Sequence, residues 1–87
     1  MLIYRLYQYC GDSSEDYFYG YFKTKEAMLT KVRKVAEKEL IGAYYKTSID
    51  NIIERDEAFY VTYKTTHNTL HTDEPYIYDI IDTDELE

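Results

Sequence analysis

The sequence predicts an α+β domain, an antiparallel sheet of four to five strands with one amphipathic helix packed on one face. Three observations lead to this fold class. Most apolar segments alternate with a period of two, which is typical of strands, whereas one segment repeats its apolar residues at helical spacing. Short polar clusters separate these segments. The expected order of elements is ββαβββ, within a single domain over residues 1–87.

The first expected strand covers residues 2–10, where β-forming residues fall into two alternating sets. Leu2 and Leu6 share one face, and Cys10 is in phase with them, which favours a small buried residue at this position. A polar cluster with the composition of a turn follows. The almost wholly aromatic run Tyr17–Phe22 then suits a second strand, antiparallel to the first.

The helix is expected to begin after Thr24, whose hydroxyl can cap it, and to end at Gly42 in a left-handed C-terminal cap. Between these positions apolar residues recur at spacings of three and four: Met28, Leu29, Val32, Val35, Ala36 and Leu40. Lys31, Lys34 and Lys38 fall opposite this stripe, so we expect them to face water.

Residues 43–55 carry conflicting signals. Ile49, Ile52 and Ile53 fit one face of a short helix, but the β-branched content of the segment also fits a strand. The sequence favours extended structure here, with the short helix as the alternative.

The last part of the chain predicts two further strands. Ala58–Thr66 alternates clearly, and Arg55–Glu57 before it suits a hairpin turn. A polar loop is expected over 65–75. Tyr76–Ile81 is predicted as the final strand, and residues 82–87 as a frayed acidic tail.

Composition favours the cytoplasm of a bacterial host cell. No apolar run approaches the roughly 20 residues that cross a bilayer, so no membrane contact is expected. The single cysteine cannot cross-link the chain to itself, whereas secreted domains of this size typically carry several disulfides. The abundant Tyr, Ile and Lys have AT-rich codons, which indicates a bacteriophage or a low-GC bacterium.

The formal charge of −7 is concentrated near the C-terminus. Residues 1–72 hold ten basic and ten acidic side chains, whereas 73–87 hold seven acidic and no basic ones. Carboxylates displayed in this way can imitate spaced phosphates and enter the basic groove of a nucleic-acid enzyme. The alternative is a stretch that confers solubility and pairs loosely with the basic helix. Direct nucleic-acid binding is not expected, because an acidic chain repels the phosphate backbone.

Neither catalysis nor a metal site is expected. His67 and His71 are four residues apart, but they fall in an expected loop, where spacing does not fix their geometry. Cys10, a histidine and Asp73 supply the residue types of a thiol-dependent triad, so a small Cys/His-dependent enzyme is the second alternative function. Three well-separated glycines form no phosphate-binding loop, and no cofactor is expected.

A resemblance to a known class of proteins rests on two segments, the acidic stretch Asp73–Glu87 and the aromatic run Tyr17–Phe22. In size, acidity, tyrosine content and lack of a catalytic motif, the chain resembles the small phage-encoded anti-CRISPR and anti-restriction inhibitors. The resemblance is one of type and assigns no role to individual residues. It implies a non-enzymatic protein, an inhibitor or adaptor, that binds a host defence protein as a nucleic-acid mimic.

The expected contact residues combine carboxylates with tyrosine anchors, which supply large contact area at low entropic cost. They are Asp79, Asp82, Asp84, Glu85, Tyr76 and Tyr78. One helix on a sheet also leaves the second face uncovered. The alternative function is therefore a homodimer or assembly protein that associates through an open aromatic sheet face.

Overall fold

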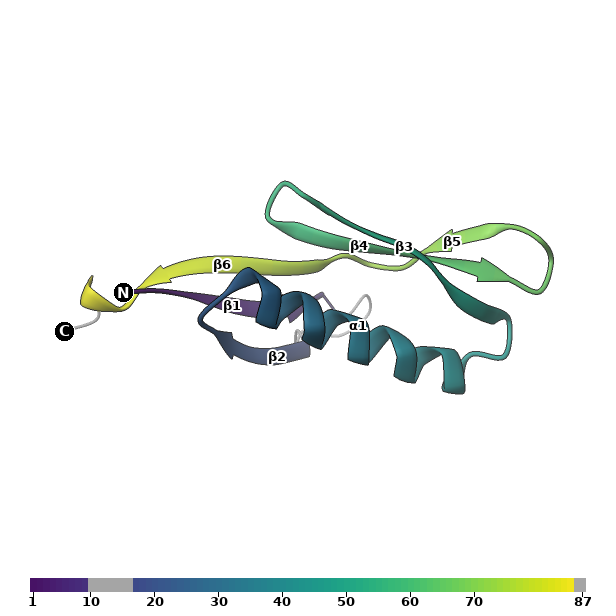
Figure 1. Ribbon diagram of the computed structural model, residues 1–87, viewed down its shortest axis with the longest axis horizontal. Helices are drawn as coiled ribbons and strands as arrows, with labels where there is room; N and C mark the ends of the chain where they lie inside the picture. Colours follow the sequence, from purple (N-terminus) through teal and green to yellow (C-terminus); the bar gives the residue numbers. More distant parts are fainter. Residues whose placement is uncertain (10–16, 86–87) are drawn as a thin grey trace.

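The computed structural model describes residues 1–9 and 17–85, all but Glu85 with their side chains. Figure 1 shows its elements, which are β1 (Leu2–Gln8), β2 (Tyr17–Phe22), α1 (Lys25–Gly42), β3 (Lys46–Arg55), β4 (Ala58–Thr65), β5 (Leu70–Thr72), β6 (Tyr76–Asp82) and a 3₁₀ turn (Thr83–Glu85). The α+β class is confirmed, as is the order ββαβββ apart from the additional strand β5. Across the described residues, no helix is both long and apolar enough to span a membrane.

The strands form one antiparallel sheet of six in the order β2-β1-β6-β4-β3, with β5 paired to β4. β6 pairs with β1 along its whole length but meets β4 only at Tyr76 and Ile77. It therefore connects two parts of the sheet, β2-β1-β6 and β3-β4-β5. The resulting molecule is elongated, with extents of 51 × 28 × 21 Å.

The helix begins as predicted but ends differently. The Thr24 hydroxyl accepts a hydrogen bond from the Ala27 N–H at 3.1 Å and caps the first turn. Gly42 belongs to the helix itself and does not adopt a left-handed conformation, contrary to the prediction. Ala43 ends the helix with extended backbone, and its N–H donates to the Glu39 carbonyl at 2.9 Å. A turn at Tyr44 and Tyr45, closed by a hydrogen bond from the Lys46 N–H to the Ala43 carbonyl at 2.9 Å, then leads into β3.

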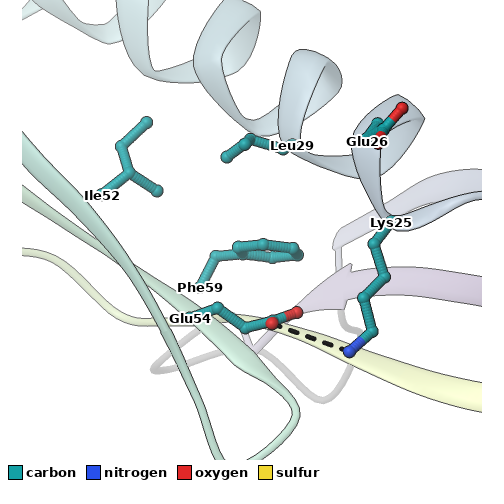
Figure 2. Close-up of a pocket in the computed structure, with 6 residues that line it drawn as sticks. All are labelled: Lys25, Glu26, Leu29, Ile52, Glu54 and Phe59. Carbon is teal, nitrogen blue, oxygen red and sulfur yellow. Dashed lines mark ion pairs between the residues drawn. The ribbon is translucent and has the colours of Figure 1, made fainter.

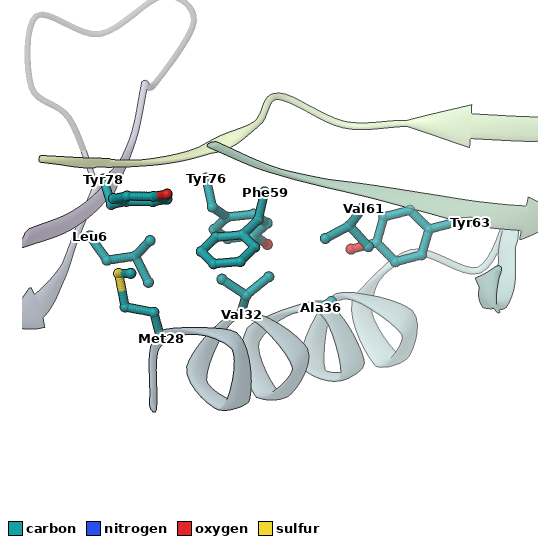
Figure 3. Close-up of a cluster of buried hydrophobic side chains, with 9 residues drawn as sticks. All are labelled: Leu6, Met28, Val32, Ala36, Phe59, Val61, Tyr63, Tyr76 and Tyr78. Atoms are coloured by element: carbon teal, nitrogen blue, oxygen red, sulfur yellow. The ribbon is translucent and has the colours of Figure 1, made fainter. Parts of the chain in front are cut away.

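The core lies between α1 and one face of the sheet (Figure 3). Met28, Val32 and Ala36 of the helix are fully buried, as their spacing predicts. They meet side chains from β1, β4 and β6: Leu6, Phe59, Val61, Tyr63, Tyr76 and Tyr78. None of the described elements covers the opposite face of the sheet, because α1 packs on one face alone.

Residues 46–55 form strand β3, which confirms the extended structure favoured for this segment. The hairpin turn to β4 is also confirmed, and its central residues Asp56 and Glu57 have φ values of 53° and 60°. Two left-handed residues in succession match the right-handed twist of the flanking strands. Two irregularities in the β3–β4 register add local twist at this sheet edge.

Two segments near the C-terminus carry more regular structure than the sequence predicts. The expected loop 65–75 contains β5, which is too short and too exposed for an alternating pattern to reveal it. Asp82 completes β6, and residues 83–85 form a 3₁₀ turn where a frayed tail was expected. The Thr83 N–H donates to the Met1 carbonyl at 2.9 Å, which extends the pairing with β1. Residues 86–87 lie outside the described part of the chain.

Candidate interaction surfaces

Tyr76 and Tyr78, expected as surface anchors, lie in the core and are 1% and 3% exposed. Even-numbered residues of β6 point toward α1, opposite Gln8 and Leu6 of β1. A ring enclosed by the helix cannot insert into a partner, so this structure does not present these two tyrosines as surface anchors.

Tyr78 has a different role, because it fixes an acidic turn beside β6. Its hydroxyl donates to Glu54 Oε2 at 3.0 Å, and its backbone N–H donates to the Glu57 carbonyl at 3.0 Å. Lys25 Nζ lies 3.6 Å from the other oxygen of Glu54. Burial and the neighbouring Glu54 carboxylate raise the pKa of the Tyr78 hydroxyl, which keeps it a donor. The β3–β4 turn is thereby held against the strand that carries the C-terminal acids.

Carboxylates from two distant segments consequently lie in one half of the molecule. In Figure 1 the β3–β4 turn and the start of α1 lie near the middle of the long axis, in the half toward which β6 runs. We define the acidic end by its carboxylates: Glu54, Asp56, Glu57, Asp82 and Asp84. Lys25, Arg55 and the Met1 amino group lie 2.8 to 3.9 Å from one of them. The side chains of Asp56 and Asp84 remain 86% and 81% exposed. Glu85 is also a predicted contact residue, but its side chain lies outside the described part of the structure.

Asp79, the remaining predicted contact residue, lies apart from the acidic end. Odd-numbered residues of β6 point to the uncovered face of the sheet, where Asp79 is opposite Arg5. Arg5 Nη2 lies 3.2 Å from Asp79 Oδ2, and the two side chains are 41% and 46% exposed. The expected set of acids therefore divides between two surfaces.

The uncovered face around this ion pair is aromatic. Tyr9, Phe18 and Tyr21 are 53%, 54% and 60% exposed. We define the open aromatic patch by its side chains: Arg5, Tyr7, Tyr9, Phe18, Tyr21 and Asp79. Four of them line a groove of about 260 Å³. Phe18 and Tyr21 meet edge to face with ring centroids 5.2 Å apart, and the Arg5 guanidinium lies 4.8 Å from the Tyr7 ring.

A bulge in β2 places Phe18 and Tyr21 on the same face. Strict alternation would put residues three apart on opposite faces. Here Phe18 pairs with Tyr7 and Tyr21 pairs with Arg5, two residues that share a face of β1, because the register shifts between them. Gly20 lies in the bulge with φ of 126°, which side chains rarely adopt. Glycine at this position therefore permits the patch to form.

An ion network at the opposite end of the helix supports the scaffold. Lys46, with its side chain 3% exposed, donates to Glu39 at 3.1 Å and to Asp73 at 2.5 Å. Its ammonium also lies 4.3 Å from the Tyr63 ring centroid. His71 Nε2 is 2.7 Å from the other oxygen of Asp73. We call these groups the Lys46 network.

The charges of this network compensate one another. Burial alone would lower the pKa of Lys46, but the hydrogen bonds to Asp73 and Glu39 outweigh it and raise that pKa above its ordinary value. Burial would raise the pKa of Asp73, yet its bonds to Lys46 and His71 lower it. The two groups stay charged and join α1, β3 and the segment before β6. Cys10, the proposed nucleophile of a triad, lies outside the described residues, and His67 is in the turn after β4.

A smaller groove of about 180 Å³ lies beside the start of α1 (Figure 2). Leu29, Ile52 and Phe59 give it an apolar lining, and the Lys25–Glu54 ion pair stands at its edge. Its volume is below the about 300 Å³ at which small-molecule pockets begin. Among the described residues, no cluster of three or more potential ligands is arranged to hold a metal ion.

No protein-family model matches the chain, and no match was found among curated proteins or solved structures. Function must therefore be inferred from the two surfaces themselves. Sequence reasoning located the open face through the aromatic run in β2, but it missed the acids of the β3–β4 turn. Their contact with β6 depends on a strand order that no local pattern specifies.

Proposed function

We propose that the chain is a non-enzymatic binding protein, an inhibitor or adaptor, that places its acidic end against a basic surface of a larger protein. The observation that carries this proposal is the meeting of the β3–β4 turn with β6, fixed by Tyr78. It brings acids separated in sequence into one half of the molecule. The nearby cations leave an excess of negative charge there.

The arrangement suits electrostatic recognition. A two-residue turn and the end of a paired strand hold their carboxylates with little conformational freedom to lose on binding. Excess negative charge of this kind accelerates encounter with a positive groove. Such grooves are characteristic of proteins that handle nucleic acids, and a bacterial defence nuclease is the partner class that the proposal names.

Capture from a bacterial lysate tests the proposal when two charge-matched variants are compared. The first neutralises the acidic end with three substitutions: Asp56→Asn, Glu57→Gln and Asp84→Asn. The control removes the same charge from exposed positions elsewhere: Glu37→Gln, Asp50→Asn and Glu74→Gln. Mass spectrometry identifies the retained proteins, and increasing salt measures the electrostatic contribution.

We expect the wild-type chain and the control to retain the same nucleic-acid-handling protein at low salt and to lose it at high salt. The acidic-end variant should lose it throughout. Equal retention by the two variants, or capture that salt does not change, would show that the acidic end is not the contact surface. Retention only of proteins without a nucleic-acid-binding groove would contradict the named partner class.

A further inference from the structure

We propose that a second copy of this chain covers the open aromatic patch, in a dimer with two-fold symmetry. The patch is separate from the acidic end, so this inference does not depend on the proposed function. It concerns the uncovered face of β1 and β2, where aromatic rings and one ion pair lie together.

The composition of the patch is that of a protein interface. Tyrosine, phenylalanine and arginine are enriched at the buried centre of such interfaces, and lysine, glutamate and aspartate are depleted. Apart from Asp79, which is paired with Arg5, the side chains of the patch follow this pattern, with Phe18 and Tyr21 more than half exposed around a shallow groove. These rings extend from paired strands, so little backbone freedom is lost when they are covered.

Charge favours a second copy as the occupant. Two chains of formal charge −7 repel each other over most of their surfaces. The open aromatic patch is locally neutral, because Arg5 and Asp79 compensate each other. Two copies can therefore approach most closely here. A symmetric contact is also self-complementary, since Arg5 of one copy can face Asp79 of the other and the reverse.

The same face provides further area. Beyond the patch, Ile53, Arg55 and Tyr60 line a second shallow groove on the face of β3 and β4, with the Arg55 guanidinium 5.2 Å from the Tyr60 ring. A standard interface buries about 800 Å² per partner. A contact that extends from the patch over Ile53 and Tyr60 adds area beyond the six side chains of the patch.

Two charge reversals, measured by sedimentation velocity across concentration, test the proposal. Arg5→Glu leaves two acidic groups on the patch, and Asp79→Arg leaves two basic groups, so each variant should repel its own copy. We expect wild type to reach twice the monomer mass of 10.5 kDa, each variant alone to stay monomeric, and an equimolar mixture to recover a dimer. Recovery in the mixture requires pairing between chains, because neither variant restores the pair within its own chain.

A second pair of variants tests the rings without changing charge. Phe18→Ser with Tyr21→Ser should raise the dimer dissociation constant about tenfold or more. Ile41→Ser with Tyr44→Ser is the control, since these side chains are 88% and 93% exposed at the end of α1, and it should leave association unchanged. Circular dichroism verifies that all variants fold.

Three results would overturn the proposal. The first is a wild-type chain that stays monomeric at every concentration. That result would also be obtained if a different protein covered the patch. The second is a mixture of the two charge variants that stays monomeric. The third is a dimer that the paired serine substitutions do not weaken.

Discussion

The two faces of the sheet both carry tyrosines, and the structure uses them in opposite ways. On the face covered by α1, Tyr63, Tyr76 and Tyr78 are at most 3% exposed. On the uncovered face, Tyr9 and Tyr21 are more than half exposed. The chain's high tyrosine content therefore combines two features, a core built from phenol rings and an exposed surface that carries the same residue type.

The covered face shows the energetic cost of building a core from tyrosine. Each buried ring contributes a large apolar area, but its hydroxyl needs a partner. Tyr78 finds one in Glu54, whereas the buried hydroxyls of Tyr63 and Tyr76 interact with each other but lack the geometry of a well-formed hydrogen bond. Rings on the open face avoid this conflict because water can reach them. Substitutions on the two faces should consequently differ in kind.

The largest contrast is expected from truncating one tyrosine on each face. Tyr76→Ala should lower the free energy of unfolding by about 4 kcal/mol, because it opens a cavity in the core. Tyr21→Ala should change it by less than about 0.5 kcal/mol, since the side chain is exposed. Urea denaturation measures both. Similar losses of unfolding free energy for the two variants would refute the division between the buried core and the open aromatic patch.

The buried polar contacts of the covered face should be nearly as sensitive. Lys46→Met leaves the carboxylates of Asp73 and Glu39 without their buried partner and should cost about 3 kcal/mol. Adding Asp73→Asn to Lys46→Met should recover part of this loss, because the uncompensated charge is removed. Denaturation of both variants and of Asp73→Asn alone completes the double-mutant cycle. Strict additivity would mean that the two groups do not interact.

Gly20 connects the two faces, because its backbone sets the bulge in β2. Gly20→Ala should cost about 2 kcal/mol, since φ of 126° is strained for alanine. It should also weaken association by separating Phe18 from Tyr21 if the register relaxes. Gly42→Ala is the matched control, because an added methyl group there meets no atom within 4 Å. A variant as stable as wild type would show that the bulge does not depend on glycine.

High pH should destabilise the fold through the buried tyrosines of the covered face. Burial raises the pKa of Tyr63 to about 12 and also raises that of Tyr76. In the unfolded chain tyrosines ionise near pH 10, so the stabilisation is complete below that pH and is lost as pH rises through the folded pKa values. Stability should fall by about 1.4 kcal/mol per pH unit for each such group.

Phenolate absorbance near 295 nm provides the measurement. The buried hydroxyls of Tyr63 and Tyr76 should ionise only as the fold is lost. Far-ultraviolet circular dichroism recorded at the same pH values locates unfolding. Ionisation of every tyrosine before the circular dichroism signal changes would contradict the raised pKa values of Tyr63 and Tyr76.

The smallest effects are expected from removing single hydroxyl groups. Tyr76→Phe should be neutral or should stabilise the fold by about 1 kcal/mol, because the lost hydroxyl makes no well-formed hydrogen bond. Tyr78→Phe should destabilise it by about 1 kcal/mol, because Glu54 loses a donor. Thermal unfolding resolves differences of this size. Equal shifts would show that hydrogen bonding does not separate the two tyrosines.

Much of the fold follows from local pattern, but the division of residues between the two faces does not. The helix and the strand that begins at Ala58 have clear periodicity, and the structure confirms both. In β6, both alternating sets of side chains are similarly apolar. The sequence places Tyr76 and Tyr78 together but does not show which face the helix covers.

The candidate surfaces show the same limit. Asp79 and Asp82 are close in the sequence, yet they belong to different surfaces because a strand alternates its side chains. Phe18 and Tyr21 share a face only through the bulge beside Gly20. Glu54 and Glu57 reach β6 through the pairing of strands that are not neighbours in sequence. Each of these relationships depends on tertiary register.

The pairing of β1 with β6 also determines how the fold responds to tension. Leu2 is opposite Asp82, and the Met1 carbonyl accepts from Thr83, so these two strand ends lie side by side. Opposed forces applied at Met1 and Thr83 would load the interstrand hydrogen bonds one after another, beginning at this pair. Such unzipping offers far less mechanical resistance than sliding the strands along each other. A tether attached at these positions should therefore peel β1 from β6 first and expose the core beneath Leu6.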